Sequence, residues 1–133
     1  MARIAEKTES SINYSKLLTR QHDGMHTNIT NAISFAACTT AAELNTACIG
    51  TITQSGFTAK MISKHRPICP IVAATISERV WRQLNLVWGC KPMLHKDKLP
   101  QGKVFDTGMG IIQESGLVKN GDTVVMALGD PRA

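Results

Sequence analysis

Three hydroxyl side chains and one glycine stand close together at Thr53–Thr58, the part of the sequence best suited to bind a ligand. Thr53, Ser55 and Thr58 carry the hydroxyls, and Gly56 lets a ligand approach the backbone without a Cβ in the way. An apolar run ends here and a helix is expected to begin, so unpaired N–H groups and the helix dipole favour an anion, most often a phosphate. The candidate phosphate-binding residues are Thr53, Gln54, Ser55, Gly56, Phe57 and Thr58.

The same turn has a simpler interpretation, because Ser and Thr are also favoured as ordinary helix caps. It is not a Walker loop, since the Gly-Lys-Ser/Thr ending is missing. No histidine or carboxylate stands next to the turn to act as a general base. We therefore expect binding without catalysis and assign no catalytic residue.

Metal chemistry is not expected from the cysteines or the histidines. The four cysteines are Cys38, Cys48, Cys69 and Cys90, and the four histidines are His22, His26, His65 and His95. No two cysteines have the short spacing of a zinc pair, and three lie in apolar stretches, so buried reduced thiols are expected rather than disulfides. The scattered histidines are expected at the surface, and no metal ligand is assigned.

Positive charge is concentrated in the middle of the chain. Residues 60–103 carry nine basic and two acidic side chains, a balance of +7, whereas residues 1–59 carry four of each. Such a field favours an anionic ligand or partner, and an ordinary solvated face is the alternative. Only 5% of the residues are aromatic, and no apolar run approaches the ~18 residues of a membrane span. We expect a cytoplasmic protein that binds neither nucleic acid nor membrane.

Apolar runs that alternate with helical patterns must position the turn. Strands are expected at residues 47–53, 67–75, 90–94 and 123–128. Helices are expected at residues 1–18, 27–44, 55–64 and 104–117, and after a cap at Ser77. Strands that are apolar throughout predict an α/β fold, a three-layer sandwich whose mostly parallel sheet has helices on both faces, in a single domain over residues 1–133. Such sheets bind ligands beyond the carboxyl ends of their strands, where the turn at 53–58 falls.

The helix expected at 27–44 has a face made largely of small residues, which would let it lie close to the sheet. The residues expected on this face are Ile29, Ala32, Ile33, Ala36, Ala37, Thr40, Ala41 and Leu44. Farther along, Trp81 and Trp88 stand seven residues apart. They are expected to share a helical face that serves core packing or a subunit contact.

An ordered series of motifs runs from Thr53 to Thr75. The turn Thr53–Ala59 has the pattern Thr-x-Ser-Gly-x-Thr-Ala, and a short helix, Arg66-Pro67 and a strand follow it. Further motifs are Met1–Glu9, Gln83–Gly89, Ser115–Leu117 and Gly121–Val125. In this order, over nearly the whole chain, they resemble the C-terminal domain of pyruvate kinase.

The resemblance implies a regulatory and subunit-assembly domain. In the family, this domain binds an allosteric phosphorylated effector at the turn matching Thr53–Thr58 and forms part of the contact between subunits of a tetramer, which implies a homo-oligomer. Phosphoryl transfer between phosphoenolpyruvate and ADP, with its magnesium and potassium ions, belongs to a separate catalytic barrel that nothing in this chain resembles. Residues 1–18 would be the helix that enters from that barrel. We expect the isolated chain to have no pyruvate kinase activity and no cofactor of its own.

Two departures from the family pattern restrict the class of effector that is expected and the position expected for the last strand. Some members hold a second phosphate with an arginine in the helix matching Val104–Ile112, where this chain has Asp106 and Thr107. The effector is therefore expected to be a sugar monophosphate or AMP-like. The family's final strand has no match, so Thr123–Leu128 is expected at a sheet edge. The alternatives are a free-standing enzyme acting on a small phosphorylated metabolite and a structural oligomerisation domain with an empty turn.

Overall fold

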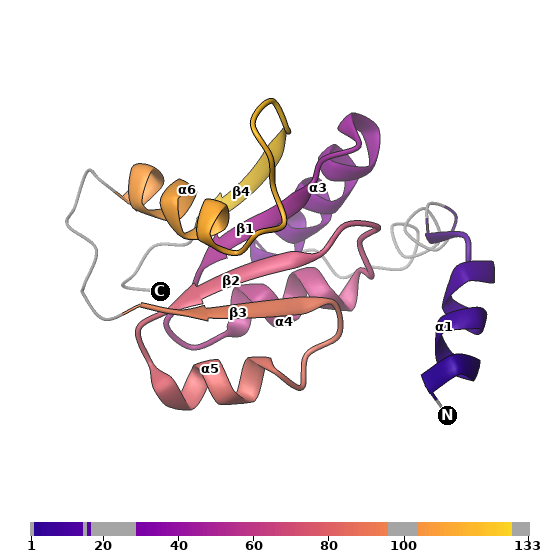
Figure 1. Ribbon diagram of the computed structural model, residues 1–133, viewed down its shortest axis with the longest axis horizontal. Coiled ribbons are helices and arrows are strands. Elements are labelled where there is room, and N and C mark those ends of the chain that lie inside the picture. Colours follow the sequence, from indigo (N-terminus) through magenta and orange to yellow (C-terminus); the bar gives the residue numbers. More distant parts are fainter. Residues whose placement is uncertain (1, 15, 17–28, 96–103, 129–133) are drawn as a thin grey trace.

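The computed structural model describes residues 2–14, 16, 29–95 and 104–128, and Figure 1 shows how they are arranged. In chain order the elements are α1 (Ala2–Ser11), α3 (Ile29–Leu44), β1 (Cys48–Ile52), α4 (Phe57–Lys64), β2 (Ile71–Thr75), α5 (Glu78–Leu84), β3 (Cys90–Leu94), α6 (Val104–Glu114) and β4 (Val124–Leu128). All four expected strands are present. The helix expected at 104–117 is also present, but α6 ends at Glu114.

The strands form one parallel sheet in the order β3-β2-β1-β4. The chain moves outward from β1 through β2 to β3 and then returns to the other side of β1 with β4, so the strand order reverses between β1 and β4. All of β2 and the first four residues of β1 are buried, as expected for the central strands of a parallel sheet. Within the described sheet β4 lies at an edge, which confirms that prediction.

Helices cover both faces of the sheet, which confirms the predicted three-layer α/β sandwich. On one face, Ile62 of α4 packs in a cluster with α3 residues and Ile71, and α5 continues this face where Leu84 lies in a cluster with Ala73. On the opposite face, α6 packs Ile112 with Val72. Residues 71, 72 and 73 alternate between the two faces because successive strand side chains point to opposite sides. Figure 1 shows α6 and α5 on opposite sides of the sheet.

The buried face of α3 differs from the one that its spacing predicted. The buried residues are Ser34, Ala37, Cys38 and Ala41. Ala37 and Ala41 are on the predicted face, but the large side chains expected beside them, Ile29, Ile33 and Leu44, are 81%, 48% and 57% exposed, and Ala32, Ala36 and Thr40 are exposed as well. Apolar residues occur all around this helix, so periodicity alone could not select a face. Small residues on the buried side let the helix approach the sheet closely, and Phe35 packs against the same cluster.

The polar helix predicted for residues 1–18 is present in its first part as α1, which ends at Ser11, and residues 12 and 13 are not helical; every residue of α1 is exposed. Residues 1, 15, 17 and 18 lie outside the described residues. Figure 1 shows α1 apart from the sandwich. Among the helices that the structure describes, none is long and apolar enough to cross a membrane.

All four cysteines are free; Cys38 and Cys48 are buried as predicted, whereas Cys69 and Cys90 are only half-buried. Burial raises the pKa of Cys38 to about 12 and the pKa values of Cys48 and Cys90 to about 11, and the neighbouring Cys69 adds to the rise for the first two. Thiolates are the reactive form of cysteine, so these thiols are poor nucleophiles at neutral pH. Their contribution is packing.

His65 contradicts the prediction of surface histidines, because it is only 1% exposed. It caps the C-terminus of α4, and its ring lies edge-on to Phe35 of α3 with centroids 5.8 Å apart. Burial lowers the pKa of His65 below its ordinary value of 6.5, and the charge of Lys64 lowers it further. The fold therefore favours the neutral imidazole. His22 and His26 lie outside the described residues.

We expect acid to weaken the fold through His65. The unfolded chain takes up a proton on this histidine as the pH falls below about 6.5, whereas the native state resists it, so the free energy of unfolding falls over that range and levels off below the native pKa. The slope is at most about 1.4 kcal/mol per pH unit. Urea titrations between pH 8 and pH 5 should show a smaller loss in His65→Gln than in the unchanged protein. Equal losses in the two proteins would contradict this origin.

Candidate functional site

The turn that follows β1 lies where parallel sheets bind their ligands. β1 ends at Ile52, and α4 begins at Phe57, so the candidate residues connect the carboxyl end of a central strand to a helix N-terminus. The strand order reverses between β1 and β4, and the crevice beyond such a reversal point is the usual ligand site of these sheets. The topology therefore places the turn where its sequence pattern predicted a ligand.

Two hydroxyls of the turn bind its own backbone. The Thr53 Oγ1 accepts a hydrogen bond from the Gly56 N–H at 2.9 Å, and the Ser55 Oγ accepts one from the Phe57 N–H at 3.3 Å. These are the bonds of an ordinary capped turn. A hydroxyl that accepts such a bond still has its own hydrogen to donate, so Thr53 and Ser55 could also donate to an anion.

Gly56 is the N-cap of α4 and has a left-handed backbone with φ of 83°. It brings no side-chain acceptor of its own, and because Ser55 accepts only from the Phe57 N–H, the Thr58 and Ala59 N–H groups of the first turn need other partners. A Cβ added here would lie 3.3 Å from both Leu84 Cδ2 and Val80 Cγ1 of α5. The position therefore requires glycine for its conformation and for its close packing.

Most of the turn's side chains face solvent. Gln54, Ser55 and Phe57 are exposed and Thr58 is half-buried, whereas Thr53 is 7% exposed. A ligand could therefore reach the Ser55 hydroxyl and the open start of α4 from outside. The exposed positive charge of Arg79 lies at the start of α5, at the same carboxyl edge of the sheet. The first turn of α6 brings the negative charge of Asp106 to this edge.

The structure thus brings together the six candidate residues of the turn and adds two that the sequence reasoning missed. Val80 and Leu84 support Gly56 from α5, and their apolar spacing showed only that they face the core. In the ranges that the structure describes, no group of three or more His, Cys, Asp or Glu side chains could hold a metal ion.

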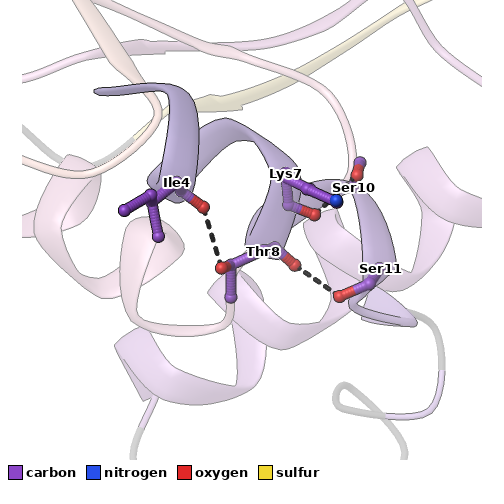
Figure 2. A pocket seen from close by; sticks show the side chains of 5 residues that line it. All are labelled: Ile4, Lys7, Thr8, Ser10 and Ser11. Atoms are coloured by element: carbon purple, nitrogen blue, oxygen red, sulfur yellow. Dashed lines mark hydrogen bonds between the residues drawn. The ribbon is translucent and has the colours of Figure 1, made fainter. Parts of the chain in front are cut away.

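A shallow hollow lies on α1, away from the turn. Its lining residues are Ile4, Lys7, Thr8, Ser10 and Ser11 (Figure 2). The hydroxyls of Thr8, Ser10 and Ser11 donate to carbonyls of α1 itself, at 2.7–2.8 Å. One exposed helix supplies the whole lining, so nothing converges on a ligand from a second element. The turn remains the better candidate site.

Comparisons with known proteins identify similar chains. The family model described as the pyruvate kinase alpha/beta domain matches residues 31–133. A pyruvate kinase of Clostridium acetobutylicum is 39% identical over 131 residues, which are 98% of this chain and 28% of the relative. A pyruvate kinase of Staphylococcus aureus is 36% identical over 98% of this chain and 22% of the relative. The chain therefore spans about a quarter of the length of these curated relatives.

Solved structures show the same similarity. A crystal structure of a pyruvate kinase from Cryptosporidium parvum superposes with a TM-score of 0.81 at 29% identity, over 91% of this chain and 25% of that one. A second structure of the Cryptosporidium parvum enzyme, in complex with ADP, has a TM-score of 0.83 at 28% identity, over 96% and 26% of the two chains. The arrangement of strands and helices around the turn is thus shared with these enzymes.

Proposed function

We propose a role for this chain, which belongs to the pyruvate kinase family through its α/β domain. It is a regulatory and subunit-assembly domain that binds a phosphorylated effector at Thr53–Thr58. The observation that carries the proposal is the place of the turn, beyond β1 at the reversal of strand order, with hydroxyls at a helix start whose N-cap residue is glycine. Phosphoryl transfer from phosphoenolpyruvate to ADP, with magnesium and potassium, would belong to the catalytic part of such an enzyme. The present domain would then regulate that catalytic part without taking part in the reaction.

The effector class that we propose is a monophosphate, either a sugar phosphate or an AMP-like nucleotide. Asp106 in the first turn of α6 places a carboxylate where some relatives are expected to have an arginine for a second phosphate. A carboxylate repels a second phosphate group. One phosphate at the turn can still use the Ser55 and Thr58 hydroxyls and the start of α4.

Removing two hydroxyls should weaken this ligand. In Ser55→Ala/Thr58→Ala we expect at least a tenfold loss of affinity for AMP or glucose 6-phosphate, about 1.4 kcal/mol, because each bond to a charged phosphate contributes roughly 1.5–3 kcal/mol. Isothermal titration calorimetry measures the change. Thr8→Ala/Ser10→Ala is the matched control, since it removes two exposed hydroxyls of α1. Equal affinities in the two double variants would move the site elsewhere.

A structural oligomerisation domain with an empty turn is the second candidate function. The specific observation in its favour is that Thr53 and Ser55 already satisfy backbone N–H groups inside the turn. The same titration separates the two functions. Binding that depends on Ser55 and Thr58 favours the regulatory domain, and no heat with either monophosphate favours the structural one.

Assembly is expected to use the outer face of α3. Ile29, Ile33 and Leu44 are exposed there, and an apolar face of this kind on a folded domain tends to be an interaction site. We expect sedimentation of the unchanged chain to show concentration-dependent association, which Ile33→Glu abolishes. Leu86→Glu is the control, because Leu86 is 91% exposed in the turn between α5 and β3, away from α3. A strict monomer at high concentration would contradict assembly through α3.

A further inference from the structure

The contact between the N-terminal segment and the sandwich is small. Every residue of α1 is exposed, and Ile4 has an exposed fraction of 67%. Ile12, just after the helix, is also exposed, at 41%. The described hydrogen bonds of residues 2–16, such as Thr8 to Ile4 and Lys16 to Asn13, stay within this segment. Between described residues, no hydrogen bond or ion pair joins residues 2–16 to residues 29–128. Between the described residues, the contact therefore comes from another kind of interaction.

An aromatic pair supplies this contact in the part of the chain that the structure describes. The ring of Tyr14, three residues beyond α1, lies 5.7 Å from the ring of Trp88 between centroids, with an interplanar angle of 45°. This distance is within the range of favourable aromatic pairs. Trp88 belongs to the turn between α5 and β3, at the amino-terminal edge of the sheet. The pair lies at the edge opposite to the Thr53–Thr58 turn.

The sandwich holds Trp88 ready for this contact. The Ser63 hydroxyl at the end of α4 donates to the Trp88 carbonyl at 2.6 Å. The Arg66 guanidinium lies over the Trp88 ring, 4.8 Å from its centroid, and donates to the Ser63 carbonyl at 2.9 Å. Arg66 has a left-handed backbone with φ of 51°, which is unusual for a residue with a side chain. The hydrogen bond from Ser63 and the contact with Arg66 thus hold Trp88 in position without any contribution from Tyr14.

We propose that the Arg66–Trp88 pair is a docking site for the ring of Tyr14, and that it attaches the N-terminal segment to the sandwich as a latch that opens without unfolding the sandwich. The sandwich keeps its own core in three clusters that contain no residue of the segment 2–16. Loss of the Tyr14 ring therefore detaches residues 2–16 from the sandwich but leaves the core intact. The latch sets the direction in which α1 leaves the domain.

Trypsin cleavage of the full chain tests the latch. Lys16 lies two residues beyond Tyr14, and cleavage after Lys16 tracks the population of the open segment. An aromatic pair corresponds to roughly a two- to tenfold change in an equilibrium constant. We expect Tyr14→Ala to be cleaved after Lys16 faster by that factor, and Tyr14→Phe, which keeps the ring, to match the unchanged chain. Ile12→Ala is a control in the same segment and should also match it.

A second measurement follows Trp88 directly. In a Trp81→Phe background, acrylamide quenching of the remaining tryptophan should increase in Tyr14→Ala, because the neighbouring ring 5.7 Å away is gone. Unfolding in urea should have the same midpoint in Tyr14→Ala and in its parent. Unchanged cleavage and quenching in Tyr14→Ala would overturn the proposal. A lower unfolding midpoint would also overturn it, because Tyr14 would then belong to the core.

Discussion

Replacing Gly56 with alanine is expected to lower the free energy of unfolding by about 2–5 kcal/mol. A left-handed backbone costs a residue with a Cβ about 1–2 kcal/mol, and Gly56 has φ of 83°. The new methyl group would also press on Val80 and Leu84, each 3.3 Å away, and overpacking of a core adds about 1–3 kcal/mol. Urea denaturation of Gly56→Ala measures the sum.

Gly116→Ala isolates the backbone part of this effect. Gly116 also has a left-handed backbone, with φ of 77°, but a Cβ there would meet nothing within 4 Å. We expect it to cost about 1–2 kcal/mol, the strain alone. If Gly56→Ala lowers the free energy of unfolding no more than Gly116→Ala does, then α5 can shift to accommodate the new methyl group without cost. The contact between the candidate turn and α5 would then be looser than the structure indicates.

Replacing Gly50 with alanine should cost about 1–3 kcal/mol in the core between β1 and α6. A Cβ at Gly50 would overlap the Cδ1 of Ile112 and lie 3.2 Å from its Cγ1. Ile112 is only 2% exposed, so its side chain has little room to turn away. Inserting a methyl group into such a packed site forces strained side chains or a shift of α6. Thermal and urea unfolding of Gly50→Ala measure the loss.

Ile112→Val provides the rescue, because valine lacks the Cδ1 atom that the new methyl group would overlap. Alone it should cost about 0.5–1.5 kcal/mol. In Gly50→Ala/Ile112→Val we expect a smaller loss than the sum of the two single losses, which is the sign of direct contact. Gly110→Ala on the same helix is the control, since a Cβ there meets nothing within 4 Å and alanine favours a helix. Strict additivity in the double variant would contradict the overlap.

The sequence was a good guide wherever short-range chemistry decides the conformation. Strands with apolar residues on both faces, such as β2, could only be central strands of a covered sheet, and that prediction is confirmed. Ser77 caps α5 as predicted, by accepting a hydrogen bond from the Val80 N–H at 3.3 Å. The hydroxyl-rich turn was located in the same way, because a cap and a glycine act on neighbouring residues. Its ligand remains a prediction from that pattern and from the family.

Packing between distant segments decided the rest. Trp81 and Trp88 do not share a helical face, because α5 ends at Leu84 and Trp88 lies in the next turn, where it meets Arg66 and Tyr14. Nothing in the spacing of these residues indicates that contact, since it joins three segments that are far apart in the sequence.

The sequence by itself determined the order of strands and helices and the position of the candidate turn, because caps, glycines and apolar runs act over a few residues. The tertiary structure decided which side of α3 is buried, why the pKa of His65 is lowered and why Gly50 and Gly56 have no room for a side chain. These properties depend on which side chains come into contact when the helices pack on the sheet. Those side chains are neighbours in space but not in sequence.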